Sequence, residues 1–411
     1  MTASILFLII VLIIIANQLF DFTFSFLNRS YRNKPIPKVL EGIYDDAEYT
    51  KQQSYEADNS RFSLWSSLVS FVGILLILFF DGFAYLDNLL RDYLENEIYI
   101  SLLFFGILMF LSSLISLPFS LYSTFVIEEK YGFNRTTVKT FFFDLIKGAF
   151  LSVIIGGALL YIIILLYQTF GSYFWLLTWG IVTAFMLFLN MFYSQLIVPL
   201  FNKQTPLEEG SLRSAIEAFS RKAGFQLKNI FVIDGSKRSS KANAYFAGLG
   251  SKKRIVLYDT LIEELEEEEI VAVLAHEVGH YKHKHTLKGM ITSVIQTGLI
   301  LYLFSLVIDQ PLLNQALGSN HTTFHFGLIV FSFLFEPFSM VLGILSNMFS
   351  RKNEYEADAF AKSYGLGDAL ISGLKRLSKH SLSNLTPHPA FVFVHYSHPS
   401  LYQRIVHLIK L

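Results

Sequence analysis

The chain has 411 residues, of which 53% are hydrophobic and 16% are charged, and its mean hydropathy is +0.45. Soluble proteins carry about 25% charged residues, so this composition excludes an ordinary soluble protein and indicates a multispanning membrane protein. The formal net charge is zero and there is no cysteine. No basic domain for nucleic acid is therefore predicted, and any metal must be bound by histidine and carboxylate side chains.

Seven stretches are long and apolar enough to cross a bilayer, which requires about 20 residues each. The first continues without a small-residue cleavage site, so we interpret it as a retained span and not as a signal peptide. The predicted spans cover residues 3–25, 63–83, 98–125, 145–168, 173–200, 289–308 and 324–348.

Lysine and arginine lie mainly on one side of these spans. The loops after the first, third, fifth and seventh spans hold nearly all of them, whereas the loops after the second, fourth and sixth contain only Arg91. By the positive-inside rule, the N-terminus lies outside and the C-terminus in the cytosol.

Two segments, 201–288 and 350–411, are not membrane-like, and this topology places both in the cytosol, where they can build one domain together. The first segment predicts a helix over 208–223, a strand over 229–234, a polar loop, and a hairpin that joins 243–248 to 254–258 through a turn at 250–253. Such a strand edge can hold an extended peptide by main-chain hydrogen bonds. An ordinary small sheet fits the pattern equally well.

The next helix carries the sequence His276-Glu277-Val278-Gly279-His280 after an acidic start over 263–269. Positions four apart lie on one helical face, so His276 and His280 can bind one Zn²⁺ while Glu277 reaches a water beside it. The alternative of two surface histidines fits poorly with the apolar residues 271–275 that precede them. The pattern therefore predicts a metalloprotease.

A catalytic zinc takes three protein ligands, so one more is needed. The HExxHxxGxxH subclass is excluded, because its last two positions are His283 and Thr286 here. We interpret His283 as solvated, since a third ligand from the same helical stripe has poor geometry. The other solution is the helix that includes 350–362, where Glu354 and Asp358 share a face, so that one can bind metal while the other orients a ligand histidine. Glu356 points away from that face, and a solvated charged helix is the alternative.

The chain resembles the integral-membrane zinc proteases that include the type 1 CaaX prenyl endopeptidase. The resemblance is carried by motifs spread over much of the chain, in addition to the span count and the length. They are Val126-Ile127-Glu128-Glu129-Lys130-Tyr131-Gly132-Phe133-Asn134, Gly235-Ser236-Lys237-Arg238-Ser239-Ser240, Asn243-Ala244-Tyr245, His276-Glu277-x-x-His280, Ser350-Arg351-x-x-Glu354-x-x-Ala357-Asp358 and His398-Pro399-x-Leu401-x-x-Arg404.

This resemblance implies roles for individual positions. Glu354 becomes the third zinc ligand, and Asp358 lies behind a ligand histidine. Glu277 is the general base and His398 stabilises the oxyanion. The remaining implied positions are Arg404, as a structural partner of the site, and the substrate-binding strand edge at Asn243, Ala244 and Tyr245.

The fold class implied by the resemblance is mainly α, with seven transmembrane helices forming a hollow barrel around a water-filled chamber, capped by a gluzincin-like α+β zinc protease domain. We divide the chain into spans one to five (1–200), the first part of the protease domain (201–288), spans six and seven (289–349), and the second part of the protease domain (350–411). Asn190 and Glu336, which lie inside predicted spans, suit such a chamber. For Glu336, hydrogen bonding between helices is the alternative.

The predicted function is that of a membrane zinc metalloendopeptidase with one Zn²⁺ per chain that removes the C-terminal tripeptide of prenylated CaaX-type substrates. Its expected partners are a peptide or protein substrate and the lipid bilayer, with no nucleic acid, and we expect a monomer. The short loops, the absence of cysteine and the lack of an evident eukaryotic retention signal favour a bacterial inner membrane; if the protein is eukaryotic, the endoplasmic reticulum is expected. Two alternatives stay open: a quality-control protease that ignores prenyl groups, and a non-catalytic scaffold or transporter with a closed four-ligand zinc. Roles for His283 and His285 are not predicted.

Overall fold

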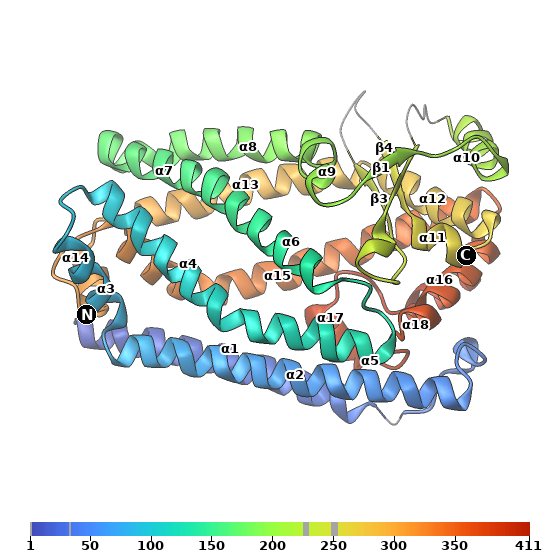
Figure 1. The fold of residues 1–411 in the computed structure, drawn as a ribbon, viewed down its shortest axis with the longest axis horizontal. Helices are drawn as coiled ribbons and strands as arrows, with labels where there is room; N and C mark the ends of the chain where they lie inside the picture. The colour runs from blue at the N-terminus through green and yellow to red at the C-terminus, as the bar shows by residue number, and fades with distance from the viewer. Residues whose placement is uncertain (1, 33, 225–229, 248–253) are drawn as a thin grey trace.

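The structure is a computed structural model and describes residues 2–32, 34–224, 230–247 and 254–411. Long helices run along the longest axis of the molecule, and a small sheet with shorter helices lies at one end (Figure 1). The long apolar helices are α1 (Ala3–Ser30), α2 (Asp46–Phe79), α4 (Glu97–Tyr122), α6 (Val138–Leu151), α7 (Gly157–Phe170), α8 (Phe174–Leu196), α13 (His285–Ser305) and α15 (Phe324–Ser363).

The other elements are short. The α-helices among them are α3 (Gly82–Arg91), α5 (Glu129–Tyr131), α9 (Val198–Phe201), α10 (Ser211–Lys222), α11 (Asp259–Glu264), α12 (Glu267–Lys282), α14 (Pro311–Ala316), α16 (Gly367–His380), α17 (Pro389–His395) and α18 (Leu401–Lys410). The 3₁₀ and π segments are η1 (Lys38–Leu40), η2 (Ser123–Glu128), η3 (Ser152–Gly156), η4 (Gly171–Tyr173) and η5 (Gly235–Lys237). The strands are β1 (Gln204–Pro206), β2 (Ile230–Ile233), β3 (Ala244–Ala247) and β4 (Arg254–Tyr258).

Six helical stretches of the described chain are long and apolar enough to cross a membrane. The longest of them, Val138–Phe201, turns at Gly171, whose φ of 51° favours glycine, and α8 then packs against α7. That stretch therefore supplies two of the seven predicted spans. The protein is a multi-pass membrane protein.

Two helices extend well beyond the predicted spans. α2 begins at Asp46 instead of residue 63, because Asp45 and Glu48 form a capping box at the start of a polar helical extension. A hydropathy profile detects only the apolar part of a helix that contacts lipid, so it does not detect such a polar extension. α15 continues from its span without a break to Ser363, so Glu354 and Asp358 stand on the same rigid helix that crosses the membrane.

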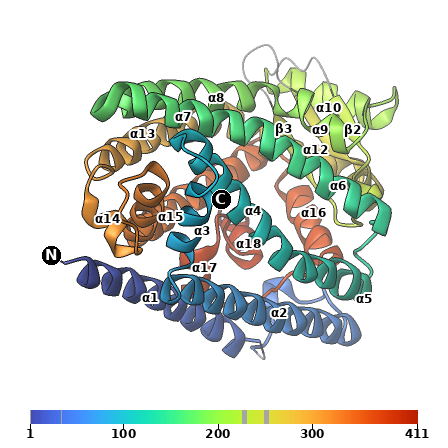
Figure 2. The same cartoon turned by 60° about the vertical axis from the view of Figure 1, so that its left-hand side comes forward.

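The long helices form a wall one helix thick. Contacts link α1 to α2, α4 to α7, α7 to α8, α8 to α13, α13 to α15 and α15 back to α1, while α3 and η2 join α2 to α4 (Figure 2). Only 6% to 22% of the most apolar window of each spanning stretch is buried. Low burial is expected of helices exposed on both faces of a wall, and it is incompatible with a solid bundle. Asn190 lines a cavity, and Glu336 is exposed and makes no hydrogen bond to a described residue, so bonding between helices does not account for it.

The end of the barrel away from the sheet is closed by α3 and α14, near the N-terminus (Figure 1). There His325 lies between Ser101, whose hydroxyl is 2.9 Å from Nδ1, and Asp87, whose carboxylate is 3.1 Å from Nε2. This order resembles a hydrolase triad, but all three residues are at most 1% exposed. The group is therefore a buried hydrogen-bond network that links α3, α4 and α15.

The other end holds a four-stranded sheet in the order β1-β2-β4-β3. β2 and β4 are parallel, and the predicted hairpin partners β3 and β4 are antiparallel, with Tyr245 opposite Val256. The predicted turn at 250–253 lies outside the described residues. Buried side chains from β2, β4, α10 and α12 share one core with Ala361, Leu370 and Leu408, so the two polar segments of the sequence pack together.

Two of the motifs that carry the family resemblance, 235–240 and 126–134, connect this domain to the membrane helices. Arg238, in the loop after β2, donates two hydrogen bonds to Asp144 of α6, with N···O distances of 2.7 and 3.0 Å. An isolated β-bridge joins the neighbouring Ser239 to Asn134. These segments therefore position the domain and are separate from the predicted metal ligands.

Candidate active site

The helix α12 presents its histidines to α15. It begins with a capping box between Glu266 and Glu269 and with acidic residues in the first turn, which complement the positive end of the helix dipole. Gly279 allows a close approach to α15: a Cβ atom there would lie 3.0 Å from both Ala357 Cα and Phe360 Cβ. The motif does not single out Gly279, because this residue occupies a variable position of HExxH.

His276, His280 and Glu354 meet at this contact. The two Nε2 atoms of the histidines are 3.1 Å apart. Glu354 Oε2 lies 3.5 Å from His276 Nε2, and Glu354 Oε1 lies 3.1 Å from His280 Nε2. Bonds of about 2.0–2.1 Å in a tetrahedral site place neighbouring ligand atoms about 3.3 Å apart, so the three separations match those of a zinc site.

The surroundings of these three residues also fit a cation. Glu354 Oε2 is buried and has no hydrogen bond of acceptable geometry, although His398 Nδ1 is 3.0 Å away. Burial lowers the pKa of the His276 imidazole, whereas hydrogen bonds with Asp358 and Glu354 raise it, and the net direction is upward. The group therefore favours positive charge, which a metal ion supplies, and it can hold one with three protein ligands.

Asp358 lies directly behind His276. Its Oδ1 is 2.8 Å from His276 Nδ1, and its two oxygens accept hydrogen bonds from Arg404 at 2.9 and 2.5 Å. Asp358 is 0% exposed. Burial lowers the pKa of the Arg404 guanidinium and Asp358 raises it, with a net rise, so the pair is ionic. The spacing argument thus placed Glu354 and Asp358 correctly on one face, and the structure brings Glu354 to the histidines and Asp358 behind one of them.

His280 has a different support, which the sequence did not suggest. Its Nδ1 is 2.9 Å from Nδ1 of His285, and His285 Nε2 is 3.0 Å from Glu356 Oε2. The prediction placed His283 on the same helix as His276 and His280, but α12 ends at Lys282, Lys284 has a φ of 58°, and α13 starts at His285. This break in the helix places His285 beside His280. His283 is exposed, as the solvated interpretation required.

Glu277 and His398 complete the group. Glu277 is half-buried on α12 and forms no hydrogen bond to a described residue, so its carboxylate is free to accept a proton from water. His398 precedes α18, and its side chain is 65% exposed although Nδ1 touches Glu354. An exposed imidazole at the rim can face a bound peptide.

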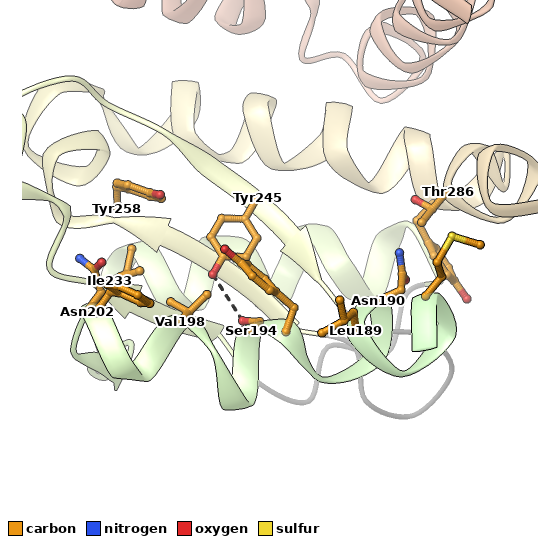
Figure 3. A pocket seen from close by; sticks show the side chains of 13 residues that line it. Leu189, Asn190, Ser194, Val198, Asn202, Ile233, Tyr245, Tyr258 and Thr286 are labelled. Carbon is orange, nitrogen blue, oxygen red and sulfur yellow. Dashed lines mark hydrogen bonds between the residues drawn. The ribbon is translucent and has the colours of Figure 1, made fainter. Parts of the chain in front are cut away.

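The predicted substrate edge is the outermost strand of the sheet, β3. Ala244 and Tyr245 belong to this strand, and Asn243 precedes it. The Tyr245 hydroxyl lies 3.4 Å from Ser194 of α8, at the wall of a cavity of about 730 Å³ (Figure 3). The cavity does not include the His–His–Glu group, but Tyr281, the residue after His280, lines it. It therefore adjoins both the strand edge and the end of α12.

We expect Gly279→Ala to weaken metal binding. The added methyl group would force α12 away from α15, which costs about 1–3 kcal/mol and separates the histidines from Glu354. Metal content after dialysis against a chelator measures the effect. Gly289→Ala on α13 is the matched control, because nothing lies within 4 Å of a Cβ atom there. Equal metal retention in both variants would contradict the role given to Gly279.

Comparisons with known proteins cover nearly the whole chain. Residues 27–203 match the family described as CAAX prenyl protease N-terminal, five membrane helices, and residues 206–411 match peptidase family M48. The chain is 40% identical over 379 residues to a CAAX prenyl protease 1 homolog of Arabidopsis thaliana, with 90% of this chain and 89% of that protein aligned. It is 37% identical to the CAAX prenyl protease 1 homolog of Homo sapiens, with coverages of 90% and 88%.

A solved structure matches equally broadly. The crystal structure of S. mikatae Ste24p superposes with a TM-score of 0.93 at 34% identity, and the match covers 98% of this chain and 99% of that one. The likeness therefore includes the barrel of helices as well as the sheet and α12.

Proposed function

The chain belongs to peptidase family M48, and we propose that this membrane metalloendopeptidase removes the C-terminal tripeptide of prenylated CaaX-type proteins with one Zn²⁺ bound by His276, His280 and Glu354. The observation that carries the proposal is the extent of the match. Proteins named CAAX prenyl protease 1 homolog align over about nine tenths of both chains, and the membrane half matches the N-terminal family of CAAX prenyl proteases. A quality-control protease that shared only the catalytic segment would not require the membrane half to match.

The bound Zn²⁺ would polarise the scissile carbonyl and lower the pKa of a water. Glu277 takes the proton from that water and later passes it to the leaving amine. His398 donates a hydrogen bond to the oxygen on which negative charge develops. Asp358 with Arg404, and His285 with Glu356, hold the two histidine rings in the orientation that leaves each Nε2 lone pair free.

The substrate strand would lie along β3 and continue its antiparallel pairing. The edge from Asn243 to Tyr245 offers main-chain groups that no described strand pairs on the outer side. A CaaX protein carries its prenyl group on a cysteine near its C-terminus. The lipid would then stay within the helical barrel while the last residues reach the site. We place the protease domain in the cytosol and the N-terminus outside, from the distribution of lysine and arginine.

Incubation of the purified protein with a farnesylated CaaX peptide tests the proposal. We expect release of the C-terminal tripeptide, loss of release with a zinc chelator, and recovery when zinc is restored, since the ligand set has no second source of water activation. The same peptide without the farnesyl group is the control. Equal cleavage of both peptides would favour the quality-control alternative, and cleavage unaffected by chelation would contradict the metal site.

A further inference from the structure

We propose that His283, His285 and Glu356 form a second divalent-cation site, and that filling it weakens the metal site at His280. Each of these residues offers a ligand atom, and the three atoms all lie within 4.8 Å of one another. The inference rests on the proposed zinc site in one respect, the state of His280, and its test does not require any peptide to be cleaved.

The break between α12 and α13 builds this second group. His283 follows the last residue of α12 and His285 is the first of α13, and their rings stack with centroids 5.5 Å apart and an angle of 14° between the planes. Glu356 reaches the pair from α15. His285 is buried and His283 is exposed, so the group has one fixed ligand and is open to solvent on the other side.

The ligand chemistry selects the class of metal. Two imidazoles and one carboxylate suit Zn²⁺, Co²⁺, Ni²⁺ or Cu²⁺, whereas Mg²⁺ and Ca²⁺ prefer oxygen ligands. A lysine competes with a cation for Glu356. Lys352 Nζ lies 3.9 Å from Glu356 Oε1, and its side chain is 73% exposed. The exposed ligand His283 and the nearby lysine make this site weaker than the one at Glu354, so it fills when free metal is in excess.

Hydrogen-bond donors and acceptors couple the two sites. A neutral imidazole has one N–H and one lone pair. If His280 Nε2 binds metal, the proton is on Nδ1 and is donated to His285 Nδ1, so the His285 proton is on Nε2 and is donated to Glu356. One arrangement satisfies all three groups, and it leaves no lone pair on His285 Nε2, the nitrogen that faces Glu356.

A cation at the second site needs a lone pair on His285 Nε2, the nitrogen that faces Glu356. The Nε2 proton of His285 is then lost to water and the ring takes up a proton at Nδ1, which faces the N–H of His280 at 2.9 Å. The hydrogen bond behind His280 is lost. Loss of such a supporting bond typically lowers metal affinity about 10–100-fold, and the coupling is reciprocal, so the metal at His280 opposes filling of the second site by the same factor.

Equilibrium dialysis of the full-length, zinc-loaded protein against graded zinc tests the proposal, with bound metal measured per chain. We expect a second, weaker equivalent in the wild type and its loss in His283→Ala, whose side chain is exposed and has no part in the chain from His280 to Glu356. Glu356→Gln should lose the second equivalent as well. His321→Ala, which removes an exposed histidine elsewhere, is the matched control and should bind as the wild type does.

Release of isotopically labelled zinc from the first site measures the coupling. Excess unlabelled zinc should accelerate release about 10–100-fold in the wild type and leave it unchanged in His283→Ala. Absence of a second equivalent in the wild type, or its persistence in His283→Ala, would overturn the site. A release rate that is the same with and without excess zinc would overturn the coupling. Failure of the protein to cleave a CaaX peptide would affect neither result.

Discussion

Glu277→Gln is expected to lower kcat on a farnesylated CaaX peptide about 10³-fold while leaving zinc content and Tm at their wild-type values. Glutamine keeps the length and shape of the side chain but cannot take a proton from water, and general acid–base catalysis contributes about 10²–10⁴-fold. Glu277 forms no hydrogen bond to a described residue, so its replacement leaves no partner unpaired. Steady-state kinetics, metal analysis and thermal unfolding on one preparation measure the three quantities.

The matched control for this substitution is Glu268→Gln. Glu268 lies on the same helix, in its exposed first turn, and removing its charge weakens only a favourable interaction with the helix dipole. It should keep wild-type activity. A fully active Glu277→Gln enzyme would be incompatible with the proposed role of the carboxylate, and loss of zinc in that variant would show that Glu277 holds the site together instead.

The membrane half of the fold was predictable because the bilayer imposes a simple rule of length and hydrophobicity. The predicted spans fall on α1, α2, α4, α6–α7, α8, α13 and α15, and the family resemblance is confirmed. The polar start of α2 at Asp46 was not predictable from hydropathy, because capping and packing against other polar-end elements stabilise it and lipid does not. Without the resemblance, the spans alone could not have distinguished a hollow ring from a packed bundle.

The candidate site was predictable to the extent that helical spacing determines which side chains share a face. His276 with His280, and Glu354 with Asp358, are such pairs, and the structure brings both pairs together. Spacing could not show which carboxylate reaches the metal, since that depends on how α12 lies on α15. His285 was missed because the helix breaks at Lys284, where no glycine, asparagine or proline indicates a break.

The supports of the two histidines differ in burial, and this difference predicts different consequences of removing them. Behind His276, the Asp358–Arg404 pair is buried, with side-chain exposures of 0% and 12%. Behind His280, Glu356 is 34% exposed and water can replace part of what it provides. Substitutions of the residues behind His276 should therefore lower both stability and metal affinity. Substitutions of Glu356 behind His280 should lower metal affinity alone.

Asp358→Asn is accordingly expected to lower both zinc affinity and stability. The amide cannot accept from His276 and from both nitrogens of Arg404 at once, and the buried guanidinium keeps only Glu354, whose Oε2 is 3.6 Å from Nη1, as a counter-charge. Breaking a buried ion pair typically costs about 3–5 kcal/mol, and losing the support behind a ligand histidine lowers metal affinity about 10–100-fold. Competition with a zinc chelator and thermal unfolding in detergent measure the two effects.

The double variant Asp358→Asn/Arg404→Met separates the two causes. If the poorly paired charge is what destabilises the single variant, removing Arg404 as well should restore part of the stability. Zinc affinity should stay below the wild-type value, because the neutral amide is a weaker acceptor for His276 Nδ1–H than the carboxylate. Asp368→Asn, an exposed carboxylate in the first turn of α16, should change neither quantity. Wild-type zinc affinity in Asp358→Asn would instead mean that the pair with Arg404 serves folding alone and that His276 is held in place by its packing between α12 and α15.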